Sequence, residues 1–143
     1  MIVYLDTSAY IKLFIAESGS DLVRETVAQA DVLASHIIAY AEMRAAFASI
    51  VRSGRLTARN MNVVKRRFER HWTKVLRFAP DEPAIRRAGA FAERFSLRGY
   101  DSVHLSSAFV LKTQAAMPLS FACFDAALNR AAARLGLDVM ARA

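Results

Sequence analysis

Short apolar runs alternate along the chain with longer stretches in which apolar residues recur every three or four positions. Short runs rich in β-branched and aromatic residues are typical of buried strands, and the longer spacing is typical of helices that bury one face. The short runs predict strands over 1–5, 32–34, 75–78 and 119–124, with an edge strand over 138–140. The periodic stretches predict helices around 11–15, over 20–30, 38–52, 57–74, 82–95 and 126–135, and one that begins at Gly99.

Strands and helices therefore alternate, which predicts an α/β fold with a mostly parallel central sheet. The 143 residues fit one domain, and no linker, repeat or low-complexity segment interrupts the pattern. We therefore expect a single domain over residues 1–143.

The net charge of the chain indicates what kind of partner it binds. Its 20 Lys and Arg residues outnumber the 13 acids, which gives a formal charge of +7, and most of the cations are Arg. Arg forms planar, two-pronged contacts with phosphate and carboxylate groups, so a nucleic acid or an acidic protein is the expected partner. The hydrophobic share of 55% excludes a disordered polycation.

Several other classes are excluded by what the sequence lacks. Cys123 is the single cysteine, so an internal disulfide is excluded, and no Cys/His cluster has zinc-finger spacing. No secretory signal precedes the first strand, and no apolar run approaches the roughly 18 residues that span a bilayer. We therefore expect a soluble, cytoplasmic protein without a membrane partner.

Two acids stand where predicted strands end. Asp6 follows the first strand, and Asp125 follows the strand over 119–124. In open α/β sheets, ligands bind at the carboxyl ends of the strands. Each Asp also stands directly before a helix, where it can serve as an N-cap, and for either residue alone capping is the simpler interpretation.

Two further acids fall within predicted helices. Asp101 lies at a helix start, where capping is again an alternative. Glu42 has only Ile and Ala residues three and four positions away, so no cation pairs with it along its helix. If it is buried without a partner, its pKa rises. The alternative is that Glu42 extends to solvent or to an Arg of another helix.

The four acids are more informative together than singly. At one edge of a parallel sheet, their mutual repulsion would be relieved by a hard divalent cation such as Mg²⁺ or Mn²⁺. Such ions bind phosphate oxygens and lower the pKa of an attacking water. An acidic metal site in a basic protein is what a nuclease requires.

The residues around these acids resemble those of a known family. Four segments occur in the order of PIN-domain ribonucleases, and within that family the chain looks most like a VapC-type toxin of a toxin–antitoxin pair. They are Val3-Tyr-Leu-Asp-Thr-Ser-Ala9, Ala39-Tyr-Ala-Glu-Met-Arg44, Arg98-Gly-Tyr-Asp-Ser-Val-His-Leu105 and Phe124-Asp-Ala-Ala-Leu-Asn-Arg130.

The resemblance implies a three-layer α/β/α sandwich and a Mg²⁺- or Mn²⁺-dependent endoribonuclease. Metal-activated water would cleave RNA and leave a 5′-phosphate and a 3′-hydroxyl. The catalytic and metal-binding acids would be Asp6, Glu42, Asp101 and Asp125, with Asp125 the weaker contributor. The implied partners are a structured RNA and a cognate VapB-type antitoxin. The chain would form a homodimer, and a heterotetramer or larger assembly with the antitoxin.

Other residues near the acids are assigned less firmly. Arg44 and Arg98 are candidates for phosphate contacts, and Thr7 for positioning, although helix capping also explains Thr7. His104 follows Asp101 by three residues and either faces the same site or packs in the core, which is the simpler interpretation. Cys123 stands two residues before Asp125, where the family often has Thr or Ser, so the hydrogen bond that such a hydroxyl would donate beside the acid is not expected. Because Cys123 lies in an apolar strand, we do not expect it to act as a nucleophile.

The stretch from Arg55 to Arg77 contains eight Lys or Arg residues and one acid. We expect some of these Arg residues to contact RNA, and Trp72 to pack in the core rather than stack on a base. Two other functions remain open: a PIN-like nuclease of RNA processing or DNA repair, and a non-catalytic basic module that binds nucleic acid.

Overall fold

The computed structural model describes residues 1–140, so the last three residues of the domain predicted over 1–143 lie outside the described part. The described residues form five strands, seven α-helices and one 3₁₀ helix. The strands are β1 (Ile2–Leu5), β2 (Val32–His36), β3 (Leu76–Phe78), β4 (Leu119–Ala122) and β5 (Asp138–Val139). The helices are α1 (Thr7–Tyr10), the 3₁₀ helix η1 (Ile11–Leu13), α2 (Ser20–Ala28), α3 (Ala39–Arg52), α4 (Ala58–Trp72), α5 (Glu82–Phe95), α6 (Gly99–Gln114) and α7 (Ala126–Arg134).

The five strands form one sheet in the order β3-β2-β1-β4-β5, and every neighbouring pair is parallel. The predicted α/β class is thus confirmed, with a sheet that is parallel throughout. From β1 the chain adds β2 and β3 on one side, then returns to place β4 and β5 on the other. Because parallel crossovers are right-handed, this reversal puts the two groups of helices on opposite faces of the sheet.

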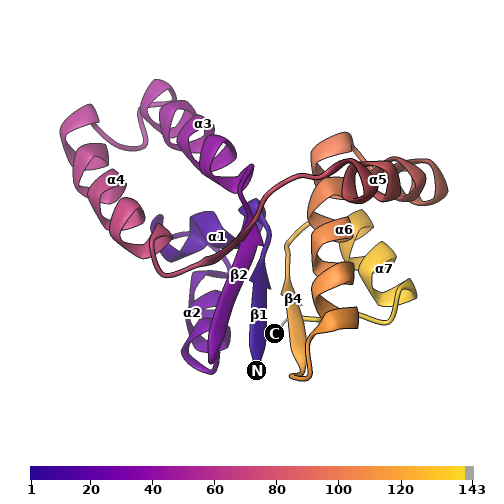
Figure 1. Cartoon of the computed structure of the whole chain (residues 1–143). Helices are drawn as coiled ribbons and strands as arrows, with labels where there is room; N and C mark the ends of the chain where they lie inside the picture. Colours follow the sequence, from indigo (N-terminus) through magenta and orange to yellow (C-terminus); the bar gives the residue numbers. More distant parts are fainter. Residues whose placement is uncertain (141–143) are drawn as a thin grey trace.

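The expected three-layer sandwich follows from that reversal. Figure 1 shows α1 to α4 on one side of the sheet and α5, α6 and α7 on the other. The segment between β3 and α5 crosses over the end of the sheet from one group to the other. β1 and β4 therefore flank the position where the strand order reverses, which is where open α/β sheets bind their ligands.

The alternation of side chains along β1 separates two hydrophobic cores. Val3 and Leu5 contribute to one core and Ile2 and Tyr4 to the other, because successive residues of a strand point to opposite faces. The first core, beneath α1 to α4, also contains Trp72, which is 8% exposed. The prediction that Trp72 packs in the core is confirmed.

Most predicted boundaries lie within two residues of those observed, and two of the differences have a visible reason. The helix predicted around 11–15 instead begins at Thr7 and ends in the 3₁₀ turn at Leu13, because Asp6 caps it directly after β1. The strand predicted over 119–124 ends at Ala122. There Phe124 donates its N–H to Oγ of Ser8 instead of continuing the ladder.

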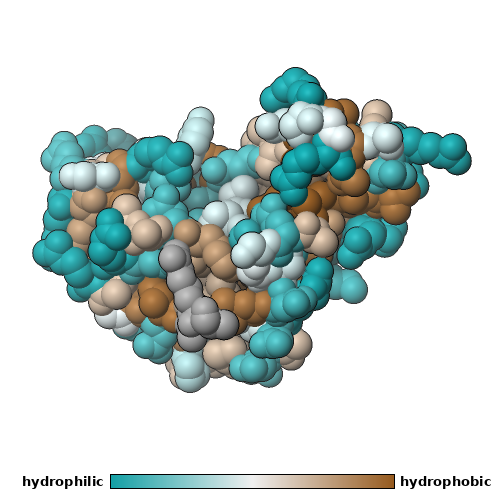
Figure 2. Space-filling model, turned by 180° about the vertical axis from the view of Figure 1, so that it is seen from behind, coloured by the Kyte–Doolittle hydropathy of each residue, from teal (hydrophilic) through white to brown (hydrophobic). Residues whose placement is uncertain are grey.

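No helix among the described residues is long and apolar enough to cross a membrane. Hydrophilic residues cover much of the face shown in Figure 2. On the arm formed by α3 and α4, hydrophobic residues are exposed between hydrophilic ones.

Candidate active site

Asp6 begins the site at the carboxyl end of β1. Its Oδ1 accepts hydrogen bonds from the N–H of Ala9, 3.1 Å away, and from Oγ of Ser8, 2.7 Å away. The capping role expected for this residue is therefore real. The residue is only 3% exposed, and burial raises the pKa of its carboxyl, against the opposing effects of the His104 charge and the Ser8 hydrogen bond.

Asp125 lies at the end of the neighbouring strand β4. Its Oδ1 accepts from the N–H of Leu128 at 2.8 Å and so caps α7, as expected. The segment before it is fixed at two points: Nδ2 of Asn129 donates to the carbonyl of Cys123 at 2.9 Å, and the Asp125 N–H donates to the Cys123 sulfur at 3.2 Å. The side chain of Asp125 remains 34% exposed.

Asp101 does not cap its helix, so the capping alternative is wrong for this residue. The N-cap of α6 is Arg98, and Asp101 lies within the first turn. Nε of Arg98 donates to Oδ2 of Asp101 at 2.8 Å, and Nη2 of Arg98 lies 3.8 Å from Oδ2 of Asp125. Arg98 thus lies between these two acids while its own side chain is 80% exposed.

Glu42, which has no cation beside it along its own helix, has two partners from other elements. Its Oε1 lies 2.7 Å from Nε2 of His104 and accepts a hydrogen bond from Oγ1 of Thr7 at 2.8 Å. Burial raises the pKa of Glu42, but the contacts with His104 and Thr7 outweigh it, so the net pKa is lowered. The upward shift expected for a buried, unpartnered Glu42 therefore does not occur, because His104 of α6 and Thr7 of α1 contact this carboxylate.

His104 explains how Glu42 is held. The imidazole is 1% exposed and contacts the hydroxyl of Tyr4 through Nδ1, at 3.0 Å. A carboxylate can only accept, so Nε2 of His104 donates to Glu42. The interpretation of His104 as a packing residue is incomplete: it is buried and it also orients an acid of the site. Its position three residues after Asp101, one turn along the same helix face, was the available signal.

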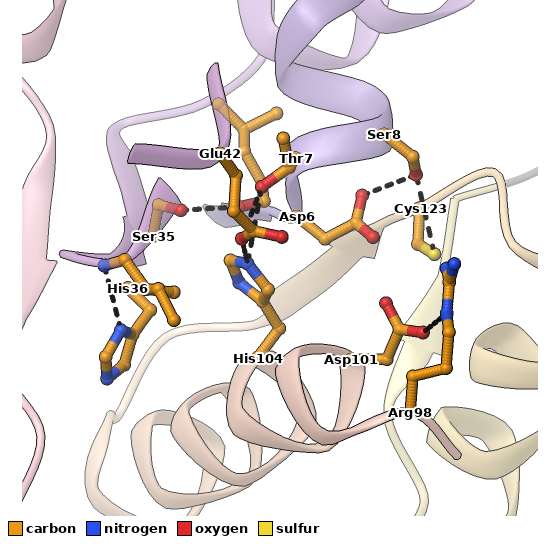
Figure 3. Close-up of polar contacts among 12 residues, drawn as sticks. Asp6, Thr7, Ser8, Ser35, His36, Glu42, Arg98, Asp101, His104 and Cys123 are labelled. Atoms are coloured by element: carbon orange, nitrogen blue, oxygen red, sulfur yellow. Dashed lines mark hydrogen bonds and ion pairs between the residues drawn. The ribbon is translucent and has the colours of Figure 1, made fainter. Parts of the chain in front are cut away.

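The four acids come from four separate segments and line one cleft. Figure 3 shows the carboxyl groups of Asp6, Glu42 and Asp101 around a common space, with Arg98 on its outer side. The cleft has a volume of about 330 Å³. Its lining consists of Asp6, Thr7, Ser8, Glu42, Arg98, Asp101, His104, Phe124 and Asp125.

The donor chemistry of this cleft suits a hard divalent ion. Four carboxylates and two hydroxyls supply oxygen ligands of the kind that Mg²⁺ and Mn²⁺ prefer. Within residues 1–140, no three His, Cys, Asp or Glu side chains are already close enough together to form a metal cluster. Instead, Glu42 contacts His104, and Arg98 contacts Asp101 and Asp125. Gathering the acids around an ion therefore requires movement of the exposed Arg98 side chain.

Comparison with known proteins shows to which family this chain belongs. The PIN domain matches residues 3–134, which contain all four acids. The chain belongs to the PIN-domain family. Ribonucleases VapC45 and VapC49 of Mycobacterium tuberculosis are each 34% identical to it over 110 residues, which are 77% of this chain and 76% of either relative. These matches place it among the VapC ribonucleases.

Solved structures agree with the PIN fold. FitAcB from Neisseria gonorrhoeae superimposes with a TM-score of 0.67 at 19% identity, covering 99% of this chain and 97% of that one. VapC20 of Mycobacterium tuberculosis, described as a sarcin–ricin loop cleaving toxin, gives a TM-score of 0.64 at 15% identity and covers 92% of this chain and 95% of its own. At these identities the likeness shows the fold.

Of the two Arg residues predicted to contact phosphate, only one lines the acidic cleft. Arg98 lines the acidic cleft, whereas Arg44 is not among the lining residues. Nη1 of Arg44 instead lies 3.3 Å from Oε1 of Glu69 on α4. In the basic stretch, Arg77 stacks over the ring of Trp72 at 5.7 Å. The phosphate role of Arg44 stays a prediction.

Cys123 occupies the position where the resemblance led us to expect a Thr or Ser hydroxyl, and its sulfur makes polar contacts there. Its sulfur lies 3.8 Å from Oγ of Ser8 and accepts from the N–H of Asp125. Burial is the main cause that raises the pKa of the Cys123 thiol, and the nearby charge of Asp6 raises this pKa further. A buried, neutral thiol is a poor nucleophile, in agreement with the interpretation from sequence.

Proposed function

We propose that this chain, as a single PIN domain, is a Mg²⁺- or Mn²⁺-dependent endoribonuclease and the toxin component of a VapBC-type toxin–antitoxin pair. One observation carries the proposal: acids from four separate segments line one cleft, and Arg98 lies at its mouth. The names of the two Mycobacterium tuberculosis relatives, both ribonucleases, support the same activity.

Each acid has a distinct part in the proposed site. Asp6 and Asp101 are the main metal ligands, Glu42 completes the set, and Asp125 contributes more weakly from the more exposed side. A bound divalent ion would supply a Lewis acid for the phosphate and lower the pKa of the attacking water. Thr7 supports the reaction by donating a hydrogen bond that fixes Oε1 of Glu42.

The substrate approaches the cleft from the side of Arg98. This guanidinium is exposed and can form two-pronged contacts with a phosphate once the phosphate reaches the acids. The net charge of +7 attracts the RNA backbone over a longer range. Hydrolysis adds water at phosphorus and breaks the bond to the 3′ oxygen, leaving a 5′-phosphate and a 3′-hydroxyl.

The proposed partners follow from family membership. A VapB-type antitoxin would bind the chain, which would form a homodimer, with a heterotetramer or larger assembly in the complex. A groove of about 430 Å³ lies between residues 14–16, the end of α3 and α4; its lining side chains are apolar except for Arg55, which supports a protein contact on this side of the molecule. We place the pair in the cytoplasm, where structured RNA is available.

Cleavage by acid-to-amide variants tests the proposal. Asp6→Asn and Asp101→Asn each remove a carboxylate charge at nearly constant size, and we expect both to abolish RNA cleavage in Mg²⁺. Asp138→Asn is the matched control, because Asp138 is exposed at the edge strand β5 and lies away from the cleft. We expect Asp138→Asn to cleave RNA like the wild type. EDTA should stop cleavage by both Asp138→Asn and the wild type.

Two of the other interpretations, a non-catalytic module and a nuclease of DNA repair, give different results in the same assay. A non-catalytic basic module would bind RNA in a salt-sensitive way but leave it intact. A nuclease of DNA repair would cleave DNA in preference to RNA. Cleavage that persists in both variants, or in excess EDTA, would overturn the proposed mechanism.

A further inference from the structure

A second, larger cavity adjoins the acidic cleft. It lies between α5 and the first turns of α6 and has a volume of about 530 Å³, within the usual range for small-ligand sites. Its walls are mostly apolar, unlike those of the cleft. The apolar part is formed by Ile85, Ala88, Gly89, Ala92, Tyr100 and Val103.

The two cavities share a wall. Glu42, Arg98 and Asp101 line both of them. An occupant of the apolar cavity therefore lies directly beside the acids and beside the guanidinium of Arg98. The site as a whole offers a charged half suited to phosphate and metal, and an adjoining apolar half that needs a flat, weakly polar group.

Two side chains that line the apolar cavity are open to solvent. Tyr100 is 63% exposed and the side chain of Arg98 is 80% exposed. An exposed aromatic ring is a platform on which a base can stack, and an exposed guanidinium contacts a phosphate.

We propose that the cavity between α5 and α6 binds the base of the RNA nucleotide next to the scissile phosphate. The inference rests on the proposed ribonuclease function and adds the place where a neighbouring base is held. A base inside a duplex is stacked and paired, so only an unpaired or flipped-out nucleotide can enter. The mostly apolar walls predict stacking with little discrimination between bases.

Gly89 offers a direct way to block the cavity. Gly89 lines the cavity, and a Cβ at this position meets no atom within 4 Å, so Gly89→Leu adds a bulky side chain to the cavity wall from a position with open space around its Cβ. The matched control is Ala90→Leu, which adds a similar side chain to the same helix at an exposed position outside the cavity. Leu is a better helix former than Gly and nearly as good as Ala, so neither substitution disfavours α5 and both proteins should fold.

The probe is a short, fluorescently labelled single-stranded RNA, with binding measured by anisotropy in EDTA so that no cleavage occurs. We expect Gly89→Leu to weaken binding about tenfold and Ala90→Leu to leave it unchanged, since each stacked base contributes strongly to affinity. An abasic oligonucleotide of the same length has no base to insert. We expect wild type and Gly89→Leu to bind that oligonucleotide equally.

Tyr100 tests the stacking platform separately. Tyr100→Ala should weaken binding of the same RNA at least fivefold, whereas Tyr100→Phe, which keeps the ring, should stay within about twofold of wild type. Calorimetric titration with Mn²⁺ should give equal affinities for wild type, Gly89→Leu and Tyr100→Ala, which shows that the acidic cleft is intact in the variants.

Two results would overturn the base site. One is equal RNA binding by Gly89→Leu and Ala90→Leu. The other is a change of oligomeric state in Gly89→Leu by analytical ultracentrifugation with unchanged RNA affinity, which would assign the cavity to a second copy of the chain. Failure of the ribonuclease function itself gives a different result, because the wild type would then not cleave RNA in Mg²⁺.

Discussion

Nε2 of His104 on α6 lies 2.7 Å from Oε1 of Glu42 on α3. This contact joins helices from opposite faces of the sheet at the edge where the acids gather. Oη of Tyr4, from β1, lies 3.0 Å from the other ring nitrogen, so the imidazole is fixed at both ends. Because His104 and Thr7 both contact Oε1, Glu42 is held in one position while its other oxygen points toward the cleft (Figure 3).

Removing the imidazole should therefore release Glu42. We expect His104→Gln to lower Mn²⁺ affinity by about 10- to 100-fold, the usual effect of losing a residue that orients a metal ligand. Isothermal titration calorimetry measures this change. His71→Gln is the control, since His71 lies 2.8 Å from the hydroxyl of Tyr10 and lines no part of the acidic cleft. Equal Mn²⁺ affinity in the two variants would contradict the assigned role.

Arg98 should have opposite effects on metal and on RNA. Its guanidinium contacts Asp101 and Asp125, so it competes with a cation for the same oxygens. Since exposed ion pairs contribute about 0.2–1 kcal/mol, Arg98→Gln should tighten Mn²⁺ binding by up to about fivefold. The same change should weaken RNA binding in EDTA, because a phosphate contact is lost.

Arg86→Gln is the matched control for this prediction. Arg86 is 78% exposed and pairs with Glu82 on α5, so its ion pair resembles that of Arg98 but lies outside the cleft. Mn²⁺ affinity that falls in Arg98→Gln, or that rises equally in both variants, would show that Arg98 does not compete with the ion.

Cys123 should be chemically inert in the folded protein. The residue is 1% exposed and burial raises the pKa of its thiol, so a thiol reagent should react only after the chain unfolds. Cys123→Ser should retain RNA cleavage, since a hydroxyl can contact Ser8 and the Asp125 N–H as the sulfur does. Rapid alkylation of the native protein, or loss of cleavage in Cys123→Ser, would contradict this account.

The pH dependence of stability should depend in part on Glu17. Burial raises the pKa of this carboxyl, but hydrogen bonds and charges from Lys12 and Arg55 outweigh it, so the net pKa lies below its ordinary value. An acid with a lowered folded pKa stabilises the native state above its unfolded pKa and loses that effect as pH falls through the folded pKa.

Glu17→Gln should accordingly destabilise the protein by about 1 kcal/mol at neutral pH. The difference from wild type should shrink once the pH falls below 4.5, the ordinary pKa of a Glu carboxyl. Urea unfolding at several pH values measures it. A difference that stays constant down to pH 3 would show that packing, rather than charge, accounts for the effect.

Much of the fold could be read from the sequence because it depends on local patterns. Asp6 and Asp125 follow apolar strands and precede helices, so both their capping and their place at the sheet edge were predictable. The parallel sheet followed from the alternation of strands and helices. These features depend on neighbours in the chain and on the period of each element.

The missed features depend on distant contacts. The partner of Glu42 is 62 residues away, so its own helix shows no cation beside it and could not decide whether its pKa is raised or lowered. The bridge from Arg98 to Asp125 likewise requires the starts of α6 and α7 to lie side by side. The cavity around Gly89 depends on how α5 and α6 pack, which no single-helix pattern shows.

The most direct test of the account is RNA end-mapping after incubation with purified wild type and with Asp101→Asn, in Mg²⁺ and in EDTA. We predict new 5′-phosphate and 3′-hydroxyl ends with the wild type in Mg²⁺, and none with Asp101→Asn or in EDTA. Ends that form with Asp101→Asn as they do with the wild type, or that carry a 2′,3′-cyclic phosphate, would contradict a carboxylate-bound metal at this cleft.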